Sequence, residues 1–217
     1  MAATYNLEKG SVYDLGKTLS EVTVGLDWDA NKDATSQSTQ FDLDVYTLPK
    51  MGDVYSELVF WGSKKSKCGS VCLSNDSQTG DDPTSESQAG KGKDDQSDHD
   101  DEQVDIKLNN LPTEITSLDV FVMIHDGEAL GQNFSQVGGA RFRLFNSNEG
   151  PKNGTLFKFA MSGEGEDTRN ILAGTFFRED DSWKFKRVEQ NGKFDQKSFK
   201  DQFKWVDGYD LKIGEKN

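Results

Sequence analysis

The sequence predicts an all-β protein: a β-sandwich of two mostly antiparallel sheets with a few short helices. Short apolar segments alternate with polar residues at period 2, as half-buried strands do. Aromatic and β-branched residues fill these segments, and Asn-Gly, Asp-Gly and Gly-rich breaks separate them. About ten short strands at this spacing are typical of a sandwich. No βαβ rhythm of about 30 residues is present, which argues against a doubly wound nucleotide-binding fold.

The expected strands follow one another along most of the chain. In Phe142-Arg143-Leu144-Phe145, for example, apolar and basic residues alternate, so that they take opposite faces of a strand. The same alternation marks residues 183–188. In chain order, the strands are predicted at residues 11–15, 21–26, 41–48, 54–61, 104–108, 117–124, 140–145, 155–161, 171–177 and 182–188.

Two segments depart from this pattern within the single domain predicted over residues 1–190. Residues 78–97 contain no aromatic and no large aliphatic side chain, so they bury too little surface to offset the entropy of ordering. We therefore expect residues 78–99 to form a disordered acidic insertion loop. In the tail, residues 191–217, the spacing of Phe194, Phe199 and Phe203 predicts a short amphipathic helix packed on the domain. A docking segment for a partner is the alternative.

The charge of the chain limits its partners. Net charge is -13 and the pI is about 4.6, which argues against a nucleic-acid-binding surface because that requires basic patches. It also argues against direct electrostatic binding to anionic lipid, unless a metal ion bridges the protein and the lipid. More than half of the charge lies between Asp76 and Glu102, which hold ten acidic residues and two lysines.

Compartment and cysteine chemistry follow from the same sequence. No apolar run approaches the roughly 18 residues of a membrane span, and no signal peptide opens the chain, so we expect a cytoplasmic protein. Cys68 and Cys72 are the two cysteines. Zinc requires four N or S ligands and the chain has only two histidines, while disulfides are rare in a reducing cytosol. Both cysteines are therefore expected to be surface thiols.

The most informative residues are acidic and stand in short groups beside Gly, Asn and Thr. Such groups repel one another unless a positive charge lies between them, and Lys and Arg are scarce in the sequence around them. A hard divalent cation is the simplest missing charge, and Ca²⁺ takes about six to eight oxygen ligands. The groups are Asp27-Trp28-Asp29, Phe41-Asp42-Leu43-Asp44, Asn75-Asp76-Ser77-Gln78-Thr79-Gly80, Asp100-Asp101-Glu102 and His125-Asp126.

Strand geometry explains how these carboxylates would meet. Alternate side chains of a strand share a face, so Asp42 and Asp44 point one way while Phe41 and Leu43 point into the core. The two aspartates around Trp28 behave in the same way. Two such edges brought together would place four carboxylates at one rim, where a divalent ion turns their repulsion into affinity.

Other sites fit the sequence less well. An EF-hand beginning at Asp27 has Lys32 where the loop requires Gly and Ser38 where it requires Glu. No Gly-x-Ser-x-Gly elbow, Walker motif or dinucleotide glycine pattern is present. We therefore expect no enzyme, no catalytic residues and no organic cofactor.

The ordered set of motifs resembles the TerD family of tellurium-resistance and stress-response proteins, over roughly residues 5 to 190. The motifs are Val24-Gly25-Leu26-Asp27-Trp28-Asp29, Phe41-Asp42-Leu43-Asp44, Asn75-Asp76-Ser77-Gln78-Thr79-Gly80, Asp100-Asp101-Glu102-Gln103-Val104, Ile124-His125-Asp126, Gln132-Asn133-Phe134, Arg143-Leu144-Phe145-Asn146 and Trp183-Lys184-Phe185-Lys186. The chain departs from the family pattern where residues 81–99 separate two of these motifs. It also has Ser77 in place of the usual Asn and His125 in place of Tyr.

The resemblance implies a β-sandwich that binds two Ca²⁺ ions through acidic loops. It implies as ligands Asp27, Asp29, Asp42, Asp44, Asp76, Thr79 (through its carbonyl), Asp100, Asp101, Glu102 and Asp126. Asp27 and Asp29 are alternatives to one another, and the assignment of each residue to an ion stays open.

The resemblance also implies a function. We expect a Ca²⁺-dependent interaction or scaffold protein in a tellurite or stress-resistance system, with other Ter-type proteins as partners and a membrane-associated complex reached through them. The alternative is a Ca²⁺-assisted receptor for a small anion, such as a cyclic nucleotide, tellurite or a lipid head group. Arg141, Arg143, Lys184 and Lys186 would then add positive charge. A hydrolase that activates water on the metal is the weaker third hypothesis.

Overall fold

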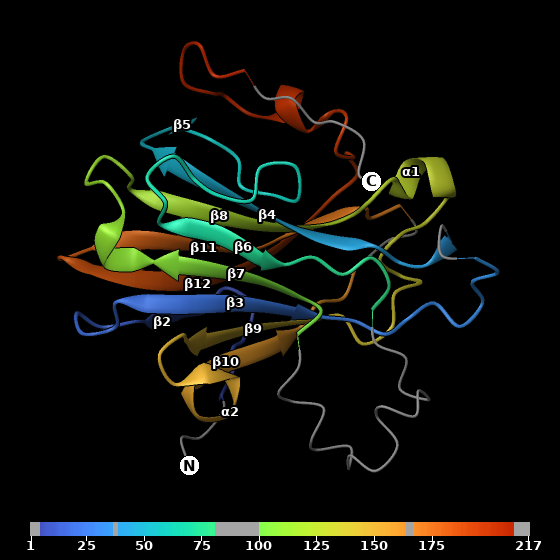
Figure 1. Ribbon diagram of the computed structural model, residues 1–217, viewed down its shortest axis with the longest axis horizontal. Helices are drawn as coiled ribbons and strands as arrows, with labels where there is room; N and C mark the ends of the chain where they lie inside the picture. Colours follow the sequence, from blue (N-terminus) through green and yellow to red (C-terminus); the bar gives the residue numbers. More distant parts are fainter. Residues whose placement is uncertain (1–4, 37–38, 81–99, 164–166, 211–217) are drawn as a thin grey trace.

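The computed structural model describes residues 5–36, 39–80, 100–163 and 167–210 (Figure 1). Two six-stranded sheets pack face to face, and every named strand pair is antiparallel except β1 with β10. The predicted β-sandwich is therefore confirmed. From residue 81 onward, the expected insertion loop lies outside the described residues. Within the described residues, no helix is long and apolar enough to cross a membrane.

Sheet A and sheet B each mix strands from distant parts of the chain. In spatial order, sheet A consists of β1 (Tyr5–Asn6), β10 (Thr155–Ala160), β9 (Arg141–Asn146), β3 (Glu21–Asp27), β7 (Glu102–Lys107) and β6 (Val71–Asn75). Sheet B consists of β2 (Val12–Asp14), β12 (Ser182–Gly192), β11 (Asn170–Glu179), β8 (Ser117–Ile124), β4 (Leu43–Met51) and β5 (Val54–Tyr55). The helices are short: α1 (Gly127–Leu130), α2 (Gly150–Gly154), η3 (Leu108–Asn110) and η4 (Phe199–Gln202).

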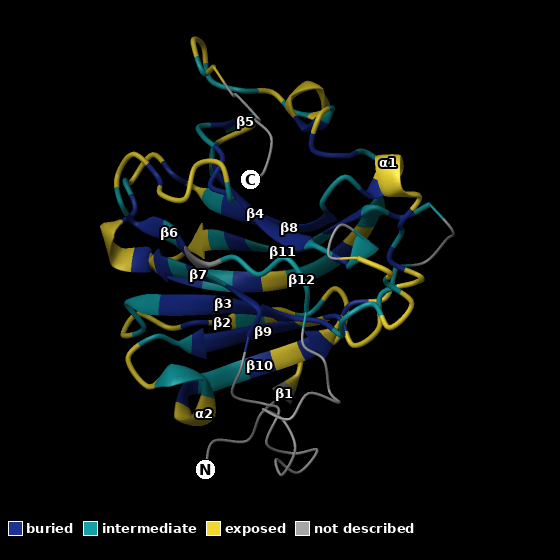
Figure 2. Ribbon diagram, turned by 45° about the vertical axis from the view of Figure 1, so that its right-hand side comes forward, coloured by how far each residue is buried: buried dark blue, intermediate teal, exposed yellow. Residues whose placement is uncertain are grey.

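The main core lies between the two sheets. Val22, Val24 and Leu26 alternate along β3 and are completely buried against side chains of sheet B. Burying one such side chain contributes about 1.5–3 kcal/mol. Figure 2 shows that burial follows the central strands of both sheets, whereas exposed residues gather in the loops. The sandwich thus forms a rigid frame whose strand ends carry the polar residues.

Strand β4 is buried on both faces. Leu43 and Val45 pack in the main core, whereas Tyr46 and Leu48 belong to a second cluster on the outer face of sheet B. We call this second group the outer aromatic cluster. Its buried members are Tyr46, Leu48, Tyr55, Leu58, Phe60, Phe121, Met123 and Phe199.

A C-terminal segment, residues 193–210, covers this outer cluster, and we call it the strap. It leaves β12 near one edge of sheet B and reaches β5 at the opposite edge (Figure 1). There the amide of Tyr55 donates to the carbonyl of Lys204 (2.8 Å), and the amide of Val206 donates to the carbonyl of Tyr55 (2.9 Å). The ring of Phe199 lies 5.1 Å from that of Tyr46. In the strap, the described helical residues form a 3₁₀-helix of four residues, Phe199–Gln202.

Some strand predictions differ from the structure. The strand expected over residues 54–61 is paired as β5 only at Val54–Tyr55, and Val59 then makes an isolated bridge to Thr47. β6 and β1 were not predicted. β6 alternates as Val71-Cys72-Leu73, but polar residues follow it at once, so its apolar pattern is too short to stand out.

Candidate metal centre

Glu102 joins the two sheets at the end of the sandwich where β4 and β7 begin. It is completely buried, and its carboxylate accepts a hydrogen bond from the amide of Val45 in β4. Thr47, two residues after Val45 in β4, exchanges backbone hydrogen bonds with Val59. A buried amide on an open strand edge needs an acceptor, and Glu102 supplies it from the other sheet. A carboxylate is thereby held inside the protein.

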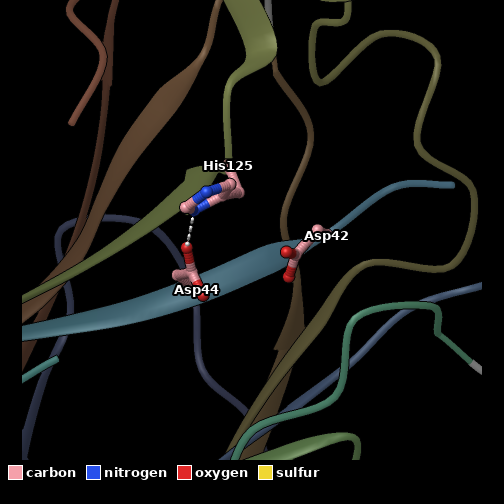
Figure 3. Close-up of side chains that lie close together, drawn as sticks. All are labelled: Asp42, Asp44 and His125. Carbon is pink, nitrogen blue, oxygen red and sulfur yellow. Dashed lines mark hydrogen bonds and ion pairs between the residues drawn. The ribbon is translucent and has the colours of Figure 1, made fainter. Parts of the chain in front are cut away.

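Four carboxylates and one imidazole gather around this point in two groups. Ligand atoms of Asp42, Asp44 and His125 lie within 4.8 Å of one another (Figure 3). Ligand atoms of Asp44, Asp76 and Glu102 do the same. Asp44 is completely buried and belongs to both groups. We call these five residues the acidic centre.

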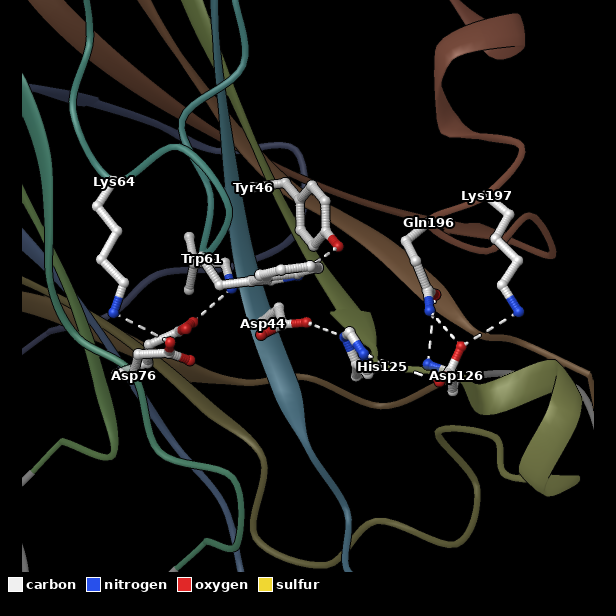
Figure 4. A network of polar contacts seen from close by, with 11 residues as sticks. Asp44, Tyr46, Trp61, Lys64, Asp76, His125, Asp126, Gln196 and Lys197 are labelled. Atoms are coloured by element: carbon white, nitrogen blue, oxygen red, sulfur yellow. Dashed lines mark hydrogen bonds and ion pairs between the residues drawn. The ribbon is translucent and has the colours of Figure 1, made fainter. Parts of the chain in front are cut away.

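Lys64 and the His125 ring each contact one carboxylate of the acidic centre. Lys64 Nζ lies 3.1 Å from Asp76 Oδ2, and His125 Nδ1 lies 3.0 Å from Asp44 Oδ2. The His125 ring also packs edge-on against Trp61, with ring centroids 5.4 Å apart. Figure 4 shows Lys64 and His125 on opposite sides of Asp44.

The negative charge of the centre affects a neighbouring tyrosine. Tyr46 follows Asp44 on the same face of β4, and its hydroxyl accepts a hydrogen bond from Trp61 Nε1 (3.4 Å). Burial raises the pKa of Tyr46 well above its ordinary value, and the nearby Asp44 carboxylate raises it further. The phenol therefore stays neutral beside the acidic residues.

His125 links the acidic centre to the strap through Asp126. Its Nε2 lies 3.9 Å from Asp126 Oδ2. Asp126 in turn accepts a hydrogen bond from Gln196 Nε2 (2.6 Å) and lies 3.6 Å from Lys197 Nζ, both of which belong to the strap (Figure 4). Asp126, a sequence-predicted ligand, thus belongs to neither group of the centre. His125 was not predicted as a site residue, although its position directly before Asp126 was the available signal.

Asp27 and Asp100 are each neutralised by an arginine of β9. Arg141 Nε donates to Asp27 Oδ2 (2.9 Å), and Arg143 donates to Asp100 Oδ1 from Nε (3.1 Å) and Nη2 (2.6 Å). Gln103 Nε2 donates to the second oxygen of Asp100 (3.0 Å). The sequence around these aspartates lacks basic residues, but β9 pairs with β3 and brings the arginines to them.

The remaining predicted ligands hold loops in place. Asp101 Oδ2 accepts a hydrogen bond from the amide of Trp28 (3.0 Å). The amide of Asp29 donates to the carbonyl of Gly138 (2.9 Å), and its carboxylate lies against the backbone of Gly138 and its neighbour. The amide of Thr79 lies 3.5 Å from Ser77 Oγ. The structure therefore groups Asp42, Asp44, Asp76 and Glu102, whereas the other predicted ligands belong to neither of these two groups.

The four carboxylates of the acidic centre match a hard cation. They supply only oxygen, the donor that Ca²⁺ and Mg²⁺ prefer, and three of them converge within one group. Two of the three, Asp44 and Glu102, are fully buried, where the repulsion between like charges is poorly screened. A divalent ion would neutralise this repulsion.

Comparisons with known proteins agree with the fold and the motifs. The family model of the TerD domain matches residues 3–202. General stress protein 16U of Bacillus subtilis (strain 168) is 33% identical over 190 residues, which cover 85% of this chain and 89% of that protein. Tellurium resistance protein TerD of Serratia marcescens is 31% identical over 192 residues, with coverage of 85% and 89%.

Solved structures show the same architecture. A homologue of telluride resistance protein (TerD) from Streptomyces coelicolor A3(2) superposes with a TM-score of 0.61 at 19% identity, and covers 83% of this chain and 95% of its own. The protein SAV2460 superposes with a TM-score of 0.64 at 22% identity, with coverage of 84% and 95%. With the family model spanning most of the sequence, these findings identify the chain as a member of the TerD family.

Proposed function

We propose that this protein is a calcium-binding module of a stress-response or tellurium-resistance system, and that the bound cation shapes a surface for protein partners. The observation that carries the proposal is Asp44, a fully buried carboxylate shared by two groups of potential ligands. Because Asp44 belongs to both groups, its carboxylate would be a ligand shared by two neighbouring ions. The names of the relatives, a general stress protein and tellurium resistance proteins, support the cellular role.

Asp42, Asp44, Asp76 and Glu102 would hold the cation. Lys64 and His125 now contact Asp76 and Asp44, and a divalent ion would compete with both for these carboxylates. Asp27 and Asp100 fit less well because Arg141 and Arg143 already neutralise them. The bound ion would supply charge neutralisation and would fix the loops that carry its ligands.

The proposal requires no reaction. The cation acts as a structural charge, and the expected partners are other stress-response proteins of the Ter type, met in the cytoplasm or at a membrane-associated complex. The anion-receptor alternative loses three of its four cationic residues: Arg141 and Arg143 contact aspartates, and Lys184 contacts Glu179 and lies 4.0 Å from Asp14. We therefore favour the interaction module.

Isothermal titration of chelator-stripped protein with Ca²⁺, and with Mg²⁺ for comparison, tests the proposal. We expect calcium-selective binding at micromolar concentration, the range of sensor sites. Asp44→Asn should abolish binding at both sites because the residue is shared, while Asp76→Asn should weaken only one.

The matched control is Asp53→Asn, an exposed carboxylate in the turn after β4. It should leave the titration unchanged. An absence of Ca²⁺ binding below about 1 mM, or binding that persists unchanged in Asp44→Asn, would contradict the proposal.

A further inference from the structure

A thiol occupies the turn before β6, at the other end of β4 from Asp44. Cys68 is exposed, and the hydroxyl of Ser66 lies 3.4 Å from its sulfur. The turn is fixed by hydrogen bonds from the amide of Ser66 to the carbonyl of Val71 (2.9 Å) and from the amide of Gly69 to the carbonyl of Ser66 (2.9 Å). The sulfur thus has a defined position relative to its neighbours.

Ser70 provides a second hydroxyl for this sulfur. Ser70 is 2% exposed, and its Oγ has no hydrogen-bond partner of ordinary geometry among the described residues. An unsatisfied buried hydroxyl costs about 1–3 kcal/mol. It nevertheless lies close enough to Cys68 to act on the thiol, and a thiolate is the acceptor that would satisfy it.

These donors favour the ionised form of Cys68. Burial raises the pKa of the thiol, but the hydroxyls of Ser66 and Ser70 and the amide of Ser70 act in the opposite direction and leave the pKa below its ordinary value. The nearby Glu57 carboxylate raises it slightly. Because the thiolate is the nucleophile, a lower pKa makes Cys68 more reactive at neutral pH.

A cavity of about 190 Å³ adjoins the thiol. Its apolar wall is formed by the end of β4 and the loop after η3, with Cys68 at the margin; the wall residues are Pro49, Met51, Leu111, Pro112 and Ile115. Lys65 and Lys67 precede Cys68 in the sequence and are exposed, and Lys67 lines the cavity together with Glu57 and Glu114. A small sulfur-bound group therefore has an apolar recess beside it, and Lys67 at the margin offers a positive charge to a carboxylate that the group carries.

We propose that Cys68 is a site of reversible S-thiolation, at which its thiolate attacks a low-molecular-weight disulfide that carries carboxylates. A new sulfur–sulfur bond forms between Cys68 and one half of the disulfide, and the original bond breaks. The other half leaves as a thiolate and takes a proton from water. The disulfide is the oxidant, so the exchange needs no further reactant.

Cys72 provides an internal control in the same chain. It lies in β6, is less exposed than Cys68, and its Sγ donates a weak hydrogen bond to the carbonyl of Leu73 (3.8 Å). The described surroundings give it no pair of serine hydroxyls comparable to Ser66 and Ser70. We therefore expect the two thiols to differ sharply in rate.

The first test treats the full chain with oxidised glutathione at pH 7 and maps the modified peptides by mass spectrometry. Cys68 should gain the glutathionyl group about tenfold faster than Cys72, and dithiothreitol should reverse the reaction. Cys72→Ser should keep the reaction, and Cys68→Ser should abolish it. Equal rates at the two cysteines would overturn the proposal.

A second test separates an activated thiol from a merely exposed one. The rate of alkylation by iodoacetamide is measured against pH for Cys72→Ser, with and without Ser70→Ala. The midpoint should lie below the ordinary value of about 8.5 and should rise when Ser70 is replaced. An unchanged midpoint in the Ser70→Ala variant, with native circular dichroism, would refute the role of the buried hydroxyl and with it the proposed site.

Discussion

Replacement of Gly25 by alanine should destabilise this protein by about 3 kcal/mol. A Cβ at this position in β3 would lie 2.3 Å from Cγ and Oδ2 of Asp100 and 2.5 Å from its Oδ1. Asp100 cannot yield easily because it is 3% exposed and is held by Arg143 Nη2 (2.6 Å) and Gln103 Nε2 (3.0 Å). The methyl group and the carboxylate therefore compete for one space.

The magnitude follows from the ion pair that the methyl group displaces. Separating a buried pair and leaving its charges uncompensated costs about 3–5 kcal/mol. Alanine restricts the unfolded chain more than glycine does and returns about 0.4–1 kcal/mol. The net loss is about 2–5 kcal/mol. For a chain of this size, 3 kcal/mol corresponds to a fall in Tm of about 6–12 °C.

Urea unfolding followed by circular dichroism measures this loss, and a double-mutant cycle assigns its cause. In an Asp100→Ala background the carboxylate is absent, so Gly25→Ala should add little to the cost of the first substitution. The coupling free energy should then approach the full effect of Gly25→Ala. The reasoning fails if Gly25→Ala changes the unfolding free energy by less than about 0.5 kcal/mol, or costs the same in both backgrounds.

Three further predictions concern the frame around the acidic centre. Trp28→Phe removes the hydrogen bond from Nε1 to the carbonyl of Phe41 (2.8 Å) and should cost about 1–3 kcal/mol in urea unfolding; an unchanged midpoint would contradict this. Phe199→Ala leaves a cavity at a fully buried position and should lower the free energy of unfolding by about 3–5 kcal/mol. The strap should then be cleaved in limited proteolysis, and a strap that stays as resistant as in the unmodified protein would refute this prediction. Burial raises the pKa of Tyr46 and Tyr55, so their contribution to stability is complete below about pH 10 and is lost as pH rises toward the folded-state pKa. The unfolding free energy should therefore fall above pH 10, and less steeply in Tyr55→Phe; equal slopes would count against burial as the cause.

The fold could be predicted because its strands are amphipathic in a simple way. Along β3, buried valines and leucine alternate with residues of the outer face, so period 2 identifies the strand and its inner face. β5 is shorter than its apolar pattern, and Tyr55 pairs with Lys50 of β4 on one edge and bonds the strap on the other. That partner lies about 150 residues further along the chain, and no local pattern indicates it.

The acidic centre could be predicted only in part. The alternation of Phe41-Asp42-Leu43-Asp44 correctly separates the core residues from the carboxylates, since Leu43 lies in the main core and Asp44 does not face it. The sequence predicts that Asp27 joins Asp42 and Asp44 at one rim. In the structure, β3 pairs with β9, and the carboxylate of Asp27 instead accepts a hydrogen bond from Arg141. Strand order is a property of the whole fold, and short motifs do not contain it.

The burial of Asp44 and Glu102 argues that the acidic centre is retained for function. Both side chains are 0% exposed and stand at strand ends, where apolar residues of similar size would pack without the cost of removing a charge from water. A pair of buried carboxylates in one group adds repulsion to that cost. Among the described residues, Asp44 and Glu102 thus depart from the apolar packing of the strands around them, and such departures are expected at binding sites. A cation at Asp44 removes both costs at once, which is why calcium should raise the stability of the protein as well as order its loops.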